Sequence, residues 1–173
     1  MLVGRDDLIE QFGESLDDGP GAPRRATLYT GARGVGKTFM LNAAEDEARR
    51  GGWLVISEAA TPGLMDRLIR DHLPWLLAAR GGSAQKRQLK GFSAPAGMGG
   101  LSWETVERYP PESGLRSMIN ALTEVLAKHA TGLLITIDEI LRKLFDDLRQ
   151  IGTQFQHAFR ENREVAFAGA WVY

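Results

Sequence analysis

Apolar side chains recur at the spacing of a helix face in five stretches of the chain, and each stretch predicts a helix. The third helix is expected to begin with Thr61 as N-cap and Pro62 as first residue, because proline is favoured in a first turn. The predicted helices span about 6–17, 39–50, 61–80, 112–126 and 141–162. Their expected core positions include Leu8, Ile9, Phe12 and Leu16 in the first, Leu115, Met118, Ile119, Leu122, Val125 and Leu126 in the fourth, and Leu144, Phe145, Leu148, Ile151 and Phe155 in the fifth.

Four short apolar runs alternate with these helices and are predicted to be buried strands. They span Ala26–Thr30, Trp53–Ser57, Gly132–Glu139 and Glu164–Ala170. Nearly continuous apolar runs are typical of strands that are covered on both faces of a parallel sheet. The order of elements therefore predicts one α/β domain over residues 1–173, with three layers in the order α-β-α.

Residues 81–111 interrupt this alternation. Glycine, serine, alanine and proline crowd 91–100, and two mixed segments, 88–92 and 101–106, lie on either side. We expect a projecting β-hairpin insertion with a flexible tip, or else an unstructured loop.

Composition narrows the classes of function. Lys and Arg number 21 against 22 Asp and Glu, so the formal net charge of -1 lacks the positive excess of a dedicated nucleic-acid-binding domain. The absence of cysteine excludes disulfides, cysteine-ligated zinc and thiol catalysis. No leader-like segment and no apolar run of about 18 residues occur, which favours a soluble, cytoplasmic protein without a membrane partner.

One loop carries a phosphate-binding signature. Between the first predicted strand and the second predicted helix, the chain reads Gly31-Ala32-Arg33-Gly34-Val35-Gly36-Lys37-Thr38, which satisfies G-x-x-x-x-G-K-[ST]. Its glycines let consecutive backbone N–H groups turn toward an anion, and the helix N-terminus behind them attracts negative charge. We expect Lys37 to reach the β- and γ-phosphates, Thr38 to bind Mg²⁺, and the following residue, Phe39, to contact the nucleotide.

Two carboxylates end the third predicted strand. Asp138 and Glu139 follow a nearly continuous apolar run, so they lie at the sheet edge where ligands of parallel α/β proteins bind. Asp138 is expected to hold Mg²⁺ opposite the Thr38 hydroxyl, directly or through water. Glu139 is expected to polarise a water molecule for attack on the γ-phosphorus.

The segments GARGVGKT and LLITIDE resemble the Walker A and Walker B motifs of additional-strand, catalytic-glutamate P-loop ATPases. Leu2-Val3-Gly4-Arg5 resembles the short box that precedes the P-loop in AAA+ proteins of the origin-recognition-like group and in STAND signalling ATPases. The resemblance implies an Mg²⁺-dependent ATPase in which Glu139 and Lys37 are catalytic. It also places Val3, Gly4 and Arg5 near the adenine.

The sequence departs from these families in one residue position and in several missing segments. They carry a polar sensor residue at the end of the fourth strand, where this chain has Gly169-Ala170-Trp171. Their strand order, 5-1-4-3-2, becomes 1-4-3-2 here with the fifth strand missing, which leaves the P-loop strand at an edge. The helical lid and the region that supplies an arginine finger are missing as well. We therefore expect the N-terminal part of a larger ATPase domain, with weak hydrolysis that a homo-oligomer or a longer parent chain would raise.

Two other functions stay open. The chain could be a nucleotide-dependent switch whose bound state is its output, or a small P-loop kinase, although its candidate lid carries only Lys86, Arg87 and Lys90. A GTPase is disfavoured because no Asn-Lys-x-Asp guanine-reading sequence occurs. The sequence does not distinguish a protein partner from a nucleic-acid partner.

Overall fold

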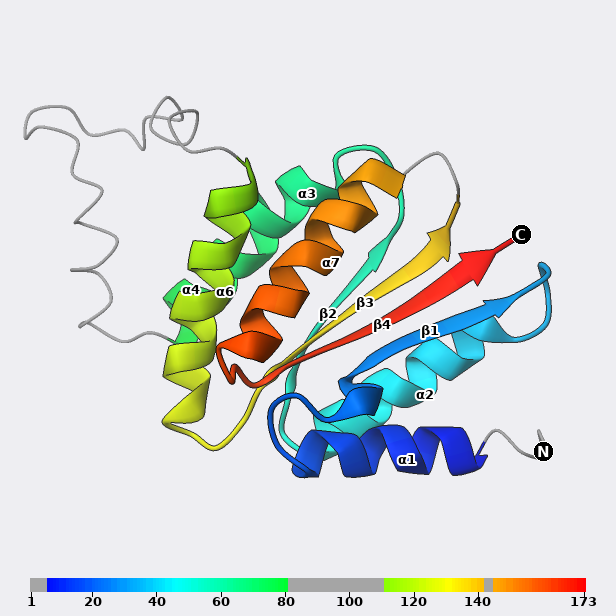
Figure 1. The fold of residues 1–173 in the computed structure, drawn as a ribbon, viewed down its shortest axis with the longest axis horizontal. Coiled ribbons are helices and arrows are strands. Elements are labelled where there is room, and N and C mark those ends of the chain that lie inside the picture. Colours follow the sequence, from blue (N-terminus) through cyan, green and yellow to red (C-terminus); the bar gives the residue numbers. More distant parts are fainter. Residues whose placement is uncertain (1–5, 81–110, 142–144) are drawn as a thin grey trace, which may run out of the picture.

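The computed structural model describes residues 6–80, 111–141 and 145–173 as a parallel sheet between two layers of helices (Figure 1). The four strands are β1 (Ala26–Gly31), β2 (Leu54–Ala59), β3 (Leu133–Ile140) and β4 (Val165–Val172). The helices are α1 (Asp6–Asp17), η1 (Pro23–Arg25), α2 (Lys37–Arg50), α3 (Leu64–Asp66), η2 (Arg67–His72), α4 (Leu73–Arg80), α6 (Pro111–Ala127) and α7 (Phe145–Arg160).

The strand order is β1-β4-β3-β2, and every neighbouring pair is parallel. This confirms the α/β class and the order 1-4-3-2 expected from the sequence. β1, which leads into the P-loop, lies at one edge of the sheet, and its Leu28 side chain is half exposed. β3 and β4 are central, so Asp138 and the end of β4 lie at the middle of the sheet's carboxyl edge.

Successive side chains of the central strands β3 and β4 point to opposite faces of the sheet, so the hydrophobic core has two parts. One face of β3 and β4 packs against α1 and α2 through residues such as Leu134 and Ala168, together with Phe12 and Leu41. The opposite face packs against α3, α4, α6 and α7 (Figure 1). The residues that β4 contributes to the core on the first face are the alanines Ala166, Ala168 and Ala170, which lets α2 lie close to the sheet.

The predicted start of the third helix was wrong. The helix begins at Leu64 after Gly63, whose φ of 82° is left-handed, and Gly63 is the N-cap. Thr61 lies before the helix, where its carbonyl accepts a hydrogen bond from the Leu64 N–H. The stretch from α3 to α4 then widens into a π-helical turn, η2, just before Pro74. Because proline has no N–H and crowds the preceding turn, a wider turn accommodates it within the helix.

Other predictions differ from the structure or lie outside it. Leu8, expected at a core position of the first helix, is 49% exposed, whereas Phe12 and Leu16 are buried. The last helix was expected from Leu141 to Asn162 but spans Phe145–Arg160, and Leu141 lies before it with a largely exposed side chain. The expected core position Leu144 and the expected hairpin lie outside the described residues, except that Pro111 begins α6. The core stripe of α6 is confirmed, with Met118 partly buried and the other five positions buried.

A buried cation fastens α1 to the sheet. Arg25 is 0% exposed, and its Nη1 pairs with Glu164 Oε2 at 2.6 Å. Its Nε donates to the Ser15 carbonyl at 2.7 Å, and Nη2 donates to the Leu16 carbonyl. The guanidinium also lies 4.9 Å from the centre of the Trp53 ring. Arg25 therefore satisfies carbonyls at the C-terminal end of α1 while joining it to the start of β4.

Candidate active site

The P-loop connects the carboxyl end of β1 to the first turn of α2, as the sequence predicts. Gly34 and Gly36 have φ values of 84° and 85°, a left-handed conformation that glycine adopts without steric cost. Gly36 is the N-cap of α2 and offers no side chain to the first-turn N–H groups. Those donors and the helix dipole thus face the loop, which is the arrangement that binds a phosphate.

Lys37 is directed into the loop rather than toward solvent. Its side chain is buried, with 8% of the residue exposed, and Nζ donates to the Gly31 carbonyl at 2.7 Å and to the Ala32 carbonyl at 2.5 Å. An ammonium group has three N–H bonds, so a third donor is left for a phosphate oxygen. The loop itself therefore orients the charge of Lys37.

The two motifs meet at one hydrogen bond. Thr38 Oγ1, on the first turn of α2, donates to Asp138 Oδ2 on β3 at 2.7 Å, although the residues are 100 positions apart in sequence. The contact lies at the exposed carboxyl edge of the sheet, beside Ala59 of β2, the register partner of Asp138. The fold thus brings together the hydroxyl and the carboxylate that the sequence predicts as metal ligands.

Glu139 lies in a bulge of β3. Ile137 pairs with Gly169 and Ile140 with Trp171, so three steps along β3 oppose two along β4. Glu139 takes up the extra residue with a left-handed φ of 53°, and its N–H donates to Asp138 Oδ1 at 2.7 Å. Bulges re-aim side chains next to active sites. Here the bulge exposes Glu139 and returns Ile140 to the core face occupied by Ile137.

The donors at this edge fit Mg²⁺. The Thr38 hydroxyl and the Asp138 carboxylate are hard oxygen ligands, which magnesium prefers, and it commonly takes one or two protein ligands beside phosphates and water. Within the part of the chain that the structure describes, no group of three or more His, Asp or Glu side chains could hold a metal by itself. The geometry therefore suits a metal that arrives with a phosphate ligand.

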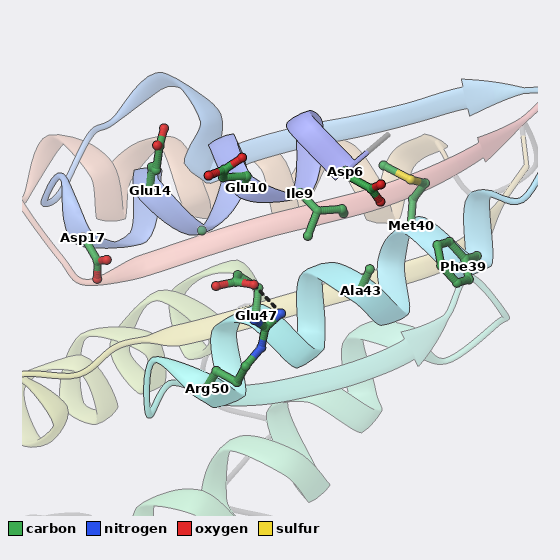
Figure 2. A pocket seen from close by; sticks show the side chains of 11 residues that line it. Asp6, Ile9, Glu10, Glu14, Asp17, Phe39, Met40, Ala43, Glu47 and Arg50 are labelled. Carbon is green, nitrogen blue, oxygen red and sulfur yellow. Dashed lines mark ion pairs between the residues drawn. The ribbon is translucent and has the colours of Figure 1, made fainter. Parts of the chain in front are cut away.

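A groove of about 530 Å³ runs between α1 and α2 (Figure 2). Phe39, predicted to contact the nucleotide, lines the end nearest the P-loop and is 56% exposed. Carboxylates dominate the rest of the lining, namely Asp6, Glu10, Glu14, Asp17 and Glu47, and Arg50 pairs with Glu47. Because these charges repel phosphate, the groove does not suit a phosphate group.

A carboxylate that the sequence analysis did not single out orders the loop beside Asp138. Glu58 of β2 accepts Arg67 Nε at 2.8 Å and contacts His72 Nε2 at 2.6 Å. Arg67 also donates to the Ala59 and Pro62 carbonyls and to the Thr61 hydroxyl. The sequence places Arg67 and His72 five residues apart in a predicted helix, which suggests a shared acidic partner. Only tertiary packing identifies that partner as Glu58 on β2.

Stability should depend on Glu58 in a pH-dependent way. Burial by itself would raise the pKa of Glu58, but the His72 and Arg67 hydrogen bonds outweigh it and hold that pKa below its ordinary value. A depressed folded-state pKa gives stability that is present at neutral pH and is lost as pH falls below about 4.5. Urea unfolding of parent and Glu58→Gln should therefore differ at about pH 7 and converge toward about pH 3.5.

The control for this prediction is Asp66→Asn, because Asp66 pairs with Arg70 on an exposed surface. That variant should differ little from the parent at either pH. A Glu58→Gln variant as stable as the parent at neutral pH would contradict the prediction.

Several predicted residues stand apart from this geometry. Val3, Gly4 and Arg5 lie outside the described residues, so their expected role near the adenine stays a prediction. The carboxyl end of β4 carries Gly169, Ala170 and Trp171 at the centre of the sheet. Of these, Gly169 and Ala170 offer no polar side chain where a sensor would lie.

Comparisons with known proteins were made with the full chain. The family model of the AAA ATPase domain matches residues 1–163. Similar solved structures include the Walker-type ATPase PABY2304 of Pyrococcus abyssi, with 17% identity and a TM-score of 0.48 over 98% of this chain and 45% of that one. The E. coli MS115-1 HORMA:CdnC:Trip13 complex matches at 9% identity and a TM-score of 0.45, over 98% of this chain and 55% of that one. This chain thus spans about half the length of either structure, and no curated protein matches it.

Proposed function

This chain belongs to the AAA ATPase domain family, and from that premise we propose that it binds ATP with Mg²⁺ and hydrolyses the β–γ phosphoanhydride slowly. The observation that carries the proposal is the Thr38–Asp138 hydrogen bond of 2.7 Å, because it unites the two motifs at the mouth of the P-loop. Family membership supports nucleotide chemistry, and the geometry supports assigning roles to individual residues.

Each role follows from a contact described above. The P-loop N–H groups and Lys37 hold the phosphates, and Thr38 and Asp138 would hold the metal. When bound there, Mg²⁺ would neutralise negative charge on the phosphates. Glu139, exposed at the bulge, accepts a proton from the attacking water or orients that water. Phe39, together with Val3, Gly4 and Arg5, is proposed to contact the adenine.

A nucleotide-dependent switch is the second candidate, and one observation favours it. Gly169 and Ala170 place no polar side chain at the central strand end, where transition-state charge would otherwise be stabilised. Lys37 is directed into the loop and would bind the phosphates in the ground state as well. We therefore propose that turnover is slow and that binding of ATP or ADP sets the conformational output.

Lys37→Ala tests the nucleotide site. Removing a charge-assisted hydrogen bond to phosphate should weaken Mg-ATP binding by about 1.5–3 kcal/mol, roughly ten- to a hundredfold. Calorimetric titration of parent and variant measures the difference. GTP should bind the parent more weakly than ATP, since the chain has no guanine-reading sequence.

Arg24→Ala is the control, because Arg24 is a cation outside the P-loop with an exposed side chain. A solvated charge there should change the affinity much less. Because Lys37 is buried, Lys37→Ala should also be checked by thermal unfolding for loss of its bonds to Gly31 and Ala32. Equal ATP affinity for folded parent and folded Lys37→Ala would remove the P-loop from the proposal.

A further inference from the structure

A second hydrogen bond joins the helix and the strand that carry the metal ligands. Thr136 Oγ1 of β3 donates to Glu45 Oε1 of α2 at 2.5 Å. Thr136 is 1% exposed and Glu45 is 6% exposed. The surrounding core face is formed by apolar residues, including Leu134 and Ala168. A buried carboxylate in such a setting is costly unless its oxygens are paired, so this contact is a specific feature of the chain.

The other oxygen of Glu45 faces outward. Arg49, one turn further along α2, donates from Nη2 to Glu45 Oε2 at 2.9 Å, and half of the Arg49 side chain is exposed. One oxygen of the Glu45 carboxylate thus accepts a hydrogen bond from Arg49 at the surface, and the other accepts one from Thr136 in the core. This division holds Glu45 between the surface of α2 and the inner face of β3.

The two hydrogen bonds between α2 and β3 are related by the geometry of the elements. Thr38 and Glu45 lie seven residues apart, on one side of the helix and about 10.5 Å along it. Thr136 and Asp138 lie two residues apart on one face of the strand, about 6.6 Å along it. Because α2 runs back from the carboxyl edge toward which β3 runs (Figure 1), Thr38 meets Asp138 near that edge and Glu45 meets Thr136 further back. The Glu45 side chain is longer than that of Thr38, and its extra length spans the difference between about 10.5 Å along the helix and about 6.6 Å along the strand.

We infer that Glu45 and Thr136 are positioning residues for the metal and phosphate site, an inference that rests on the proposed function. Their bond fixes where α2 lies along β3, and thereby how closely the Thr38 hydroxyl approaches Asp138. Without the Thr136 hydroxyl, one buried oxygen of Glu45 has no donor and the carboxylate moves toward Arg49 and water. Such a movement displaces α2, and Thr38 moves with it.

Thr136→Val tests this directly, because valine keeps the β-branched shape and removes only the donor. The measured quantity is the ratio of ATP affinity in Mg²⁺ to ATP affinity in EDTA. In the variant this ratio should fall about fivefold, less than the tenfold or more seen when a group bonded directly to a metal ligand is removed. Affinity in EDTA should stay within about twofold of the parent, because Lys37 is bonded to carbonyls of the loop that leads into α2, so that the loop and the start of the helix move together.

Thr123→Val is the matched control. Thr123 is also 1% exposed, but its hydroxyl donates to carbonyls of its own helix, α6, which packs on the face of the sheet opposite to α2. It should lower the melting temperature without changing the Mg²⁺ ratio. Thr136→Ser, which restores the donor, should recover the parental ratio even if it is less stable.

The outcomes are separable. A parent that binds ATP, with an unchanged Mg²⁺ ratio in folded Thr136→Val, overturns the positioning role and leaves the proposed function standing. An equal drop in the ratio for Thr123→Val or Thr136→Ser would also overturn it, because general destabilisation would then explain the effect. A parent that binds no ATP in either buffer refutes the proposed function itself.

Discussion

Glu139→Gln is expected to hydrolyse ATP at least about 10²-fold more slowly than the parent, close to 3 kcal/mol of barrier. The substitution keeps the length and shape of the side chain and removes the carboxylate that orients or deprotonates water. Asp138 and Thr38 retain their hydrogen bond, so Mg-ATP should bind at least as tightly as in the parent. Phosphate release at saturating ATP measures the rate, and calorimetric titration measures the affinity.

The backbone at Glu139 makes this variant a clean test. Its φ of 53° is unusual for a residue other than glycine, and its N–H is held by Asp138 Oδ1. Glutamine meets the same backbone requirements, so the bulge should persist. Glu124→Gln, at an exposed position of α6, removes one carboxylate elsewhere and should leave the rate unchanged. Equal phosphate release from parent and Glu139→Gln would leave the chain as a nucleotide-binding switch without glutamate-dependent turnover.

The parallel sheet and the meeting of the two motifs could be predicted because each depends on strong local patterns, whereas the strand order was implied by the resemblance to P-loop ATPases. Four apolar runs separated by helices restrict the sheet to parallel pairing, and the P-loop pattern marks β1 as the strand that leads into a nucleotide site. Once Asp138 ends a central strand, the parallel sheet brings it to the same edge as Thr38. Pattern and topology agree at this edge.

The features that the sequence did not predict depend on contacts between distant residues. The bulge at Glu139 exists because β3 must match β4 while returning Ile140 to the core, and neither requirement is visible in the run LLITIDEI. Likewise, Gly63 replaces Thr61 as the N-cap because Arg67, which Glu58 holds from β2, binds the loop before α3. Thr136 is a single polar residue in an otherwise apolar run, and its role depends on Glu45 of α2, a partner 91 positions away in sequence.

Arg25 is the clearest case of a residue whose importance depends on tertiary structure. It follows Pro23 and Arg24 in a turn-like segment, where charged residues are ordinarily exposed. Arg24 is indeed exposed, but Arg25 is completely buried between α1, Trp53 and Glu164. Adjacent, chemically identical side chains therefore occupy opposite environments.

Arg25→Met should destabilise the chain by about 3–5 kcal/mol, since it removes a fully buried cation that pairs with the partly exposed Glu164 and donates to two buried carbonyls. Methionine replaces much of the volume but leaves Glu164 without its cation and the Ser15 and Leu16 carbonyls without donors. Because Arg25 holds the end of α1, we expect that helix to lose protection from hydrogen exchange before the sheet does. Arg24→Met, the neighbouring exposed control, should stay within about 0.5 kcal/mol of the parent. Urea unfolding of the three proteins decides the matter, and equal midpoints for Arg25→Met and Arg24→Met would show that the buried pair contributes nothing to stability.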